Sequence, residues 1–231
     1  MKNYKHIIFD LDHTLWDFDS NCKLALEQLY LKYEFDKINS LTIEEFLKKY
    51  IEVNTRLWDQ HHRGLESKET IRNKRFIYTF EELGLSLELI PENLNADFMK
   101  LCPTMGQLIP GAMELLNYLK PKYQLHILSN GFLESQYVKM KYAHIDYFFT
   151  EVVLAEACGY AKPQKEIFEY TLTKIGGSTE DSIMVGDDLM VDILGAKNAG
   201  LNQIYYNRYN QPHKEEIFYE TNDLSTLKDL L

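Results

Sequence analysis

The chain has 231 residues, of which 45% are hydrophobic and 13% aromatic, and its formal net charge is −10 at pH 7. These proportions are enough for a well-packed core in one large domain or two unequal ones. The acidic balance argues against a broad electrostatic grip on nucleic acid or on an anionic membrane surface, so an anionic substrate has to be captured by a local group of residues.

The first predicted element is a short buried strand from Lys5 to Asp10, at the start of the sequence KHIIFDLDHTLWDF. An ionised carboxylate at the end of a buried strand is unfavourable unless a cation or hydrogen bonds compensate for it. Asp12 adds a second carboxylate two positions later. This acidic pair is a weak signal by itself, because many such pairs are solvated starts of loops.

The segment from Asn21 to about Met105 is expected to be helical throughout. Apolar residues recur at helical spacing between positions 22 and 33, and Pro91 stands where a later helix would begin. Two more helices are expected between them, one after a capping box of Thr42 and Glu45 and one from Ser67 to Leu83.

After Pro110 the pattern changes to helices that alternate with short apolar strands, which is typical of βαβ units and a parallel sheet. We therefore predict an α/β fold, a doubly wound, parallel-sheet, Rossmann-like core of residues 1–15 and 106–231, with a small α-helical cap, residues 16–105, inserted after the first strand. The expected strands are Gln124–Leu128, Glu151–Leu154, Ser182–Val185 and Gln203–Tyr206, and the expected helices start at Ala112, Leu133, Gln164 and Asp192.

Polar residues follow several of the predicted strands. Ligands of open α/β sheets bind outside the carboxyl ends of the strands, so these residues are expected to meet at one edge of the sheet. They are Asp10, Asp12 and Thr14 after the first strand, Ser129, Asn130 and Gly131 after the second, Lys162 with Pro163 in a later loop, and Gly186, Asp187, Asp188 and Asp192 near the end.

In these residues the chain resembles the haloacid dehalogenase-like superfamily of Mg²⁺-dependent phosphohydrolases, whose four motifs match DLDHT, SNG, the KP pair and GDDLMVD. The resemblance covers essentially the whole chain, because the helical insert lies where that family carries its small cap. The stretches FDLDHTLWDF, LSNGF and GYAKPQKEIFEY are similar to the pyrimidine 5′-nucleotidase branch, which includes nucleotidases for non-standard pyrimidines.

The resemblance implies a Mg²⁺ ion held by Asp10, the main-chain carbonyl of Asp12 and Asp187. Asp10 would attack phosphorus to give an aspartyl-phosphate, and Asp12 would serve as acid and then as base. Ser129 and the main-chain donors of Asn130 and Gly131 would hold the phosphoryl oxygens, Lys162 would neutralise charge, and Thr14 would support the first loop at the substrate. Asp188 is either a further ligand or an acceptor behind the ligands, and Asp192 orients either Lys162 or metal-bound water.

Several residues also have plainer interpretations. Ser129 and Asn130 could instead cap the next helix. Asp192 could be a favourable charge at a helix N-terminus, and Lys162 could be an ordinary exposed lysine. Trp16 and Phe18 are candidates for stacking on a nucleobase, whereas Trp58 is expected in the core. The run Arg72, Lys74 and Arg75 is expected on a solvated helix face, and His61, His62, His126 and His144 form no metal-binding pattern.

The expected enzyme removes the 5′-phosphate of pyrimidine nucleoside monophosphates. The alternatives are a sugar-phosphate or other small-metabolite phosphatase, a phosphomutase and a non-enzymatic scaffold that keeps the fold; a carbon–halogen hydrolase is disfavoured because Asp12 and Asp187 supply acid and metal ligand. The expected partner is a small phosphomonoester substrate, and neither a nucleic acid polymer nor a membrane is expected to bind. The chain is expected to be a monomer or a homodimer. We expect a cytoplasmic location for three reasons. The three cysteines are an odd set without CxxC spacing, the start does not resemble a secretory signal, and no apolar run reaches the ~20 residues that span a bilayer.

Overall fold

The computed structural model describes residues 4–39 and 41–231. By its contacts the chain divides into two compact units, of which one comprises Met1–Phe18 and Gly106–Leu231 and the other Asp19–Met105. The expected boundary of the insert, residue 16, lies shortly before Asp19, so Trp16 belongs to the first unit. The assignment of the two units as catalytic core and cap stays a prediction.

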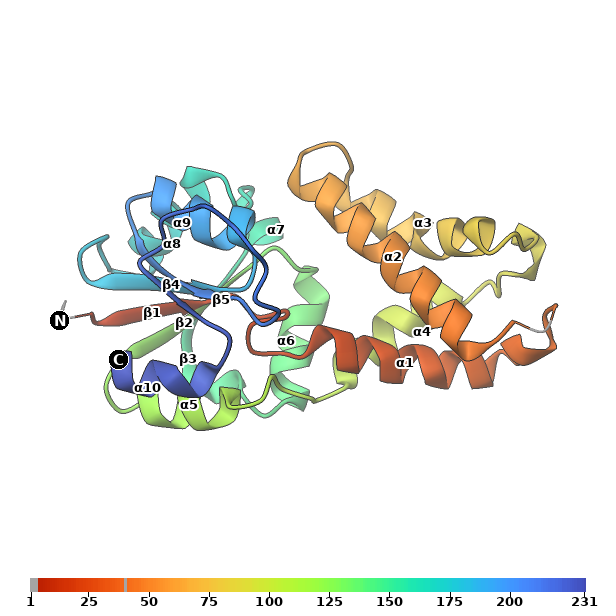
Figure 1. Ribbon diagram of the computed structural model, residues 1–231, viewed down its shortest axis with the longest axis horizontal. Helices are drawn as coiled ribbons and strands as arrows, with labels where there is room; N and C mark the ends of the chain where they lie inside the picture. Colours follow the sequence, from red (N-terminus) through yellow and green to blue (C-terminus); the bar gives the residue numbers. More distant parts are fainter. Residues whose placement is uncertain (1–3, 40) are drawn as a thin grey trace. The chain divides into compact units, whose positions relative to one another are not determined.

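The first unit is built on a six-stranded sheet in which every pair of neighbouring strands is parallel (Figure 1). The predicted α/β fold with a parallel sheet is therefore confirmed. The strand order is β3-β2-β1-β4-β5-β6, and the strands are β1 His6–Phe9, β2 Gln124–Ser129, β3 Phe149–Leu154, β4 Ser182–Gly186, β5 Asn202–Tyr206 and β6 Tyr219–Thr221.

Helices cover both faces of this sheet, with α8 and α9 on one side and α5 and α10 on the other in Figure 1. Because both faces are covered, central strands such as Ser182–Gly186 are buried along their whole length. The helices of this unit are α5 Ala112–Leu119, α6 Leu133–Tyr142, α7 Ala155–Cys158, α8 Lys165–Ile175, α9 Gly195–Asn198 and α10 Leu227–Leu230, with η4 Asp146–Phe148, the π-helical η5 Leu189–Leu194 and η6 Leu224–Thr226.

The apolar core on the α8 side fixes the sheet under the site. Ile8, Leu128 and Met184, from three neighbouring strands, pack with Ile167 and Phe168 of α8, and all five side chains are fully buried. At roughly 1.5–3 kcal/mol for each large apolar side chain removed from water, this cluster contributes much of the rigidity of the central strands. The loops that follow these strands thus start from fixed points.

The order of the strands places a switch point between β1 and β4. The chain passes from β1 to β2 and β3 on one side and then returns to β4 on the other side of β1. The Asp10 N–H donates to the Val185 carbonyl over 2.9 Å, which holds the ends of β1 and β4 together. Ligands of doubly wound sheets bind in the crevice at such a point.

The second unit is helical, as its sequence pattern predicts. Thr42 Oγ1 accepts from the Glu45 N–H at 3.3 Å while the Glu45 carboxylate accepts from the Thr42 N–H at 2.9 Å, so the predicted capping box is confirmed. In the described residues no helix is long and apolar enough to cross a membrane. The helices are α1 Phe18–Lys32, which begins in the first unit, α2 Ile43–His62, α3 Lys68–Glu82 and α4 Leu94–Leu101, with η1 Phe35–Lys37, η2 Leu87–Leu89 and η3 Cys102–Thr104.

Two expectations for the helical unit are wrong. Arg75 is only 3% exposed, because on α3 it stands four residues from Ile71 and from Thr79, which are fully buried on the same face. Its guanidinium lies 4.9 Å from the Phe98 ring, so it is not on a solvated face. Trp58 is half-buried instead of lying in the core.

Two histidines meet inside the sheet, on β1 and β2. His6 Nδ1 lies 3.1 Å from His126 Nε2. Burial, together with the neighbouring His6 and Lys120, lowers the pKa of His126 to about 4, and burial also lowers the pKa of His6. The pair is therefore neutral in the folded protein at neutral pH.

We expect the free energy of unfolding to fall as the pH drops below about 6.5. The unfolded chain protonates His126 near its ordinary pKa of 6.5, whereas the folded protein does not until about 4, so this contribution is complete above pH 6.5 and disappears between these values. It amounts to at most about 3 kcal/mol. Urea unfolding between pH 7 and 4.5 should show a shallower dependence for His126→Asn than for the unchanged chain or for His144→Asn at an exposed position. Equal slopes would contradict this explanation.

Candidate active site

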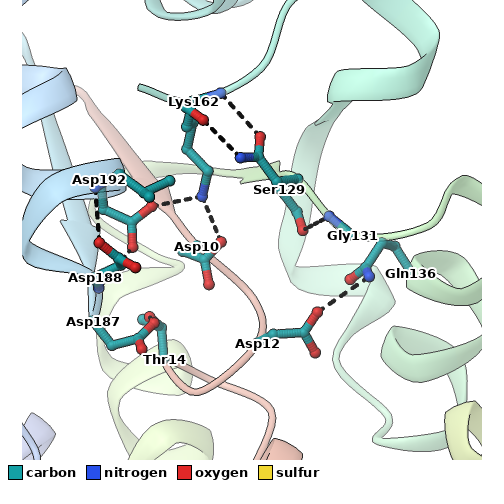
Figure 2. Close-up of polar contacts among 12 residues, drawn as sticks. Asp10, Asp12, Thr14, Ser129, Gly131, Gln136, Lys162, Asp187, Asp188 and Asp192 are labelled. Carbon is teal, nitrogen blue, oxygen red and sulfur yellow. Dashed lines mark hydrogen bonds and ion pairs between the residues drawn. The ribbon is translucent and has the colours of Figure 1, made fainter. Parts of the chain in front are cut away.

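Four charged side chains from distant parts of the sequence meet at the switch point of the sheet (Figure 2). Asp10 follows β1, Asp187 follows β4, Asp192 lies in η5, and Lys162 lies in the loop between α7 and α8. Asp10, Asp187 and Asp192 each offer a carboxylate oxygen within 4.8 Å of the others. The carboxyl ends of the strands therefore bring together the acidic residues that the sequence singled out.

Lys162 lies between two of these carboxylates. Its ammonium is 2.5 Å from Asp10 Oδ1 and 2.7 Å from Asp192 Oδ1, and its side chain is 2% exposed, so the interpretation as an exposed lysine is wrong. Although burial alone would lower the pKa of Lys162, Asp10 and Asp192 raise it above the usual value. Lys162 is a fixed cation.

The side chain of Asn130 holds Lys162 in this place. Its Oδ1 accepts from the Lys162 N–H at 2.9 Å, and its Nδ2 donates to the Lys162 carbonyl at 2.8 Å. Ser129 Oγ accepts from the Gly131 N–H at 3.0 Å. Neither residue caps α6, because the first N–H of that helix, on Leu133, donates to the Glu156 carboxylate, so that plainer interpretation is wrong.

The cluster carries more negative charge than Lys162 neutralises. Burial is the main cause that raises the pKa values of Asp10 and Asp187 well above their usual range, and the neighbouring Asp192 carboxylate raises both further. Three carboxylates around one ammonium leave a site that favours another cation.

The arrangement of oxygens fits a divalent cation. Asp10 uses Oδ1 for Lys162 and Asp187 uses Oδ1 to accept from Thr14 at 2.9 Å, and no hydrogen bond within the described residues involves Oδ2 of either. Both oxygens of Asp192 are engaged, by Lys162 and by the Asp188 N–H at 3.1 Å. Mg²⁺ prefers oxygen ligands from one or two carboxylates, which Asp10 and Asp187 would supply.

Asp188 and Asp192 have distinct local contacts. Asp188 Oδ1 accepts from the N–H groups of Met190 and Val191, each at 2.8 Å, and caps η5. A Cβ on Gly186 would lie 2.4 Å from Asp192 Oδ2, so only glycine lets Asp192 come this close to β4. The predicted contact of Asp192 with Lys162 is present in the structure, and its predicted role toward metal-bound water stays a prediction.

Asp12 points away from Asp10. In the turn after β1, His13 adopts a left-handed φ of 63°, and the N–H groups of Leu15 and Trp16 both donate to the Leu11 carbonyl. The Asp12 carboxyl faces α6, as Figure 2 shows for its contact with Gln136. Sequence reasoning thus identified Asp12 but not its neighbours on α6.

The missed neighbours are Gln136 and Lys139. Gln136 Nε2 donates to Asp12 Oδ2 at 3.2 Å, and Lys139 Nζ lies 2.6 and 2.8 Å from the two carboxylate oxygens. The buried face of α6 contains these two residues together with Ser135 and Met140. A helix between two strands whose inner face is mainly polar was the signal available in the sequence.

Trp16 is completely buried in the first unit. The Lys139 ammonium lies 4.6 Å from its ring centroid, and the ring of half-buried Phe18 is 6.0 Å away. These contacts give Trp16 a packing role beside Asp12. Its stacking on a nucleobase stays a prediction.

Comparisons with known proteins agree with this geometry. A family model described as haloacid dehalogenase-like hydrolase matches residues 4–200. The chain is 32% identical to the pyrimidine 5′-nucleotidase YjjG of Escherichia coli (strain K12), over 97% of this chain and 96% of that one. It is also 32% identical to a glyceraldehyde 3-phosphate phosphatase of Methanothermobacter thermautotrophicus, over 98% and 99%. The crystal structure of YfnB of Bacillus subtilis bound to magnesium superposes with a TM-score of 0.88 and 28% identity, covering 99% of each chain.

Proposed function

The chain belongs to the haloacid dehalogenase-like hydrolase family and is a phosphoric monoester hydrolase, and from that premise we propose that it removes the 5′-phosphate of pyrimidine nucleoside monophosphates. The observation that carries this proposal is the excess of carboxylates at the switch point, where Asp10 and Asp187 lie beside a single buried lysine. Such a site can hold a cation and, next to it, a phosphate group.

Asp10 is proposed as the nucleophile. One of its carboxylate oxygens forms a bond to phosphorus, the bond from phosphorus to the ester oxygen breaks, and the electron pair goes to that oxygen. Lys162 remains beside Asp10 throughout and neutralises the charge that develops on the phosphoryl oxygens, while Ser129 and the N–H groups of Asn130 and Gly131 donate to them.

Asp12 is proposed to move the proton. Its carboxyl group gives a proton to the departing sugar oxygen, and the resulting carboxylate then accepts a proton from the water that attacks phosphorus. The new bond from water oxygen to phosphorus replaces the bond to Asp10, so phosphate leaves and both aspartates return to their first state. Asp12 must turn part of the way from α6 toward Asp10 for this transfer.

Asp10, Asp187 and the main-chain carbonyl of Asp12 are proposed to hold Mg²⁺. When bound, the ion supplies positive charge that lets a carboxylate approach an anionic phosphate. YfnB, whose crystal structure contains magnesium, supports the proposal. Asp192 and Asp188 are proposed to support this site indirectly. Asp192 holds Lys162, and Asp188 caps the start of η5.

We expect excess Mg²⁺ to raise the thermal unfolding temperature of the chain, because it compensates the charge of the three clustered carboxylates only in the folded state. At 100 times its Kd the ion would add about 2.7 kcal/mol. Asp187→Asn should abolish this shift, whereas Asp59→Asn, at an exposed position, should keep it. A shift of the same size in Asp187→Asn, measured by calorimetry with and without Mg²⁺, would contradict the proposed ligand set.

Two classes of substrate are supported by the relatives of this chain. YjjG is a pyrimidine 5′-nucleotidase and matches over nearly the whole chain, which supports nucleotides. The likeness to glyceraldehyde 3-phosphate phosphatases makes a small sugar phosphate the second candidate.

Phosphate release should be measured on a panel of nucleoside monophosphates, small sugar phosphates and a generic aryl phosphate, each with and without Mg²⁺. Turnover that requires Mg²⁺ and has its highest kcat/KM on pyrimidine nucleotides would support the proposal. A higher kcat/KM on triose phosphates would show that the substrate is a small sugar phosphate instead. If no compound is turned over in a Mg²⁺-dependent way, the proposed mechanism is overturned.

A further inference from the structure

A second lysine in the first unit is buried beside an acidic residue of the active site. Lys139 has 7% of its side chain exposed, and its ammonium contacts both carboxylate oxygens of Asp12. Each proposed catalytic aspartate thus has its own lysine, since Lys162 contacts Asp10. The Lys139 pair is not explained by any of the steps above.

The ammonium of Lys139 is itself held in place. It lies 4.6 Å from the centroid of the buried Trp16 ring, on the turn that also contains Asp12, and 5.8 Å from that of Phe18, at the start of α1. A cation over an aromatic face is stabilised by roughly 0.5–2 kcal/mol. Trp16 and Asp12 therefore restrict Lys139 from two sides.

Gln136 restricts Asp12 from the same helix. Its Nε2 donates to Asp12 Oδ2, while its Oε1 is buried without a partner among the described residues. A buried unpaired acceptor is unfavourable by roughly 1–3 kcal/mol, so this amide is poorly explained by stability alone. A Cβ on Gly131 would lie 1.8 Å from Gln136 Nε2, which means that the glycine makes room for the contact.

We propose that Lys139, with Gln136, is a positioning residue that fixes the orientation of the Asp12 carboxyl for proton transfer. This inference rests on the proposed role of Asp12. A carboxyl group at the end of two rotatable bonds transfers a proton more efficiently when few other orientations compete with the productive one. The contacts with Lys139 and Gln136 restrict the side chain to a narrow set of orientations beside α6, and from these it turns toward Asp10 for the transfer.

The proposal is tested with Lys139→Met, Asp12→Asn and the double variant, on phenyl phosphate and p-nitrophenyl phosphate with Mg²⁺. Methionine keeps the apolar stem that packs on Trp16. Lys139→Met should lower kcat roughly 10–100-fold on phenyl phosphate, whose leaving group needs the proton, and less on p-nitrophenyl phosphate, with KM nearly unchanged. In the double variant kcat should equal that of Asp12→Asn, because Lys139 acts through Asp12.

Lys141→Met, two positions further on the same helix and exposed, is the matched control and should keep wild-type kcat. If Lys139→Met fails to fold, as judged by circular dichroism, Lys139→Gln takes its place in the same comparison. A raised KM with unchanged kcat would show that Lys139 binds the substrate directly, and additive losses in the double variant would show that it acts apart from Asp12; each overturns the proposal.

Failure of the proposed function gives a different result. In that case the unchanged chain shows no turnover that requires Mg²⁺, or Asp12→Asn loses the same factor on both aryl phosphates. If those two measurements agree with the proposed function and Lys139→Met behaves like the unchanged chain, only the role of Lys139 is overturned.

Discussion

Asp10→Asn is expected to abolish turnover while the chain keeps its fold. The amide is nearly isosteric with the carboxylate but is a poor nucleophile, so no bond to phosphorus forms at a useful rate. Loss of a catalytic nucleophile typically costs roughly 10⁴-fold or more in kcat. Phosphate release from an aryl phosphate with Mg²⁺ measures the effect, and full activity in the variant would rule out the covalent mechanism.

The stability of the same variant separates a chemical loss from a structural one. Burial and the neighbouring Asp192 and Asp187 raise the pKa of Asp10, and Lys162 keeps its contact with Asp192 in the variant, so the repulsion that is removed offsets the loss of the Asp10–Lys162 ion pair. Without metal, the unfolding temperature of Asp10→Asn should be no lower than that of the unchanged chain. A drop of several degrees would mean that lost activity reflects lost structure.

Rapid acid quenching provides an independent check on the intermediate. With a substrate labelled in its phosphate, the unchanged chain should retain label covalently during turnover, and Asp10→Asn should retain none. Asp59→Asn, an exposed position on α2, should behave as the unchanged chain does. Label that persists in Asp10→Asn would place the nucleophile elsewhere.

The central strands could be predicted because short apolar runs bounded by loops indicate buried parallel strands without any tertiary information. β1 and β4 each contain three consecutive apolar residues, 7–9 and 183–185, and each strand is followed by an acidic residue of the cluster at the switch point. Ligands of such sheets bind at the carboxyl ends of the strands, so the sequence alone predicts that Asp10 and Asp187 lie close together. The site was predictable for the same reason as the fold.

Other elements could not be predicted, since their stability comes from contacts distant in sequence. β6 has three residues, Tyr219–Thr221, and α10 has four, Leu227–Leu230, too few to establish a period. The buried lysine of α6 was missed because a lysine on a helix is normally solvated, and only the position of Asp12, 127 residues away, makes its burial favourable. The burial of Arg75 was missed because an arginine on a helix is also normally solvated, and its contact with the Phe98 ring is distant in sequence.

Lys162→Met is expected to lower both stability and turnover. Methionine fills the same buried space but leaves Asp10 and Asp192 without the ammonium that lies 2.5 and 2.7 Å from them. Breaking a buried ion pair by removing one partner costs about 3–5 kcal/mol. Turnover should fall roughly 10²–10³-fold, the effect of losing one charged donor at the transition state.

The pH dependence of that destabilisation identifies its cause. Burial already raises the pKa of Asp10, and the Lys162 ammonium lowers it, so loss of Lys162 raises the pKa of the folded Asp10 carboxyl further above that of the unfolded chain, near 3.9. The folded state then binds more protons, so the variant keeps its stability below that pH and loses it as the pH rises through the folded pKa of Asp10. Urea unfolding of Lys162→Met and the unchanged chain should therefore diverge from pH 5 to pH 8. Lys165→Met, an exposed lysine on α8, should show no such divergence, and a constant difference for Lys162→Met would mean that lost packing rather than unpaired carboxylates destabilises the fold.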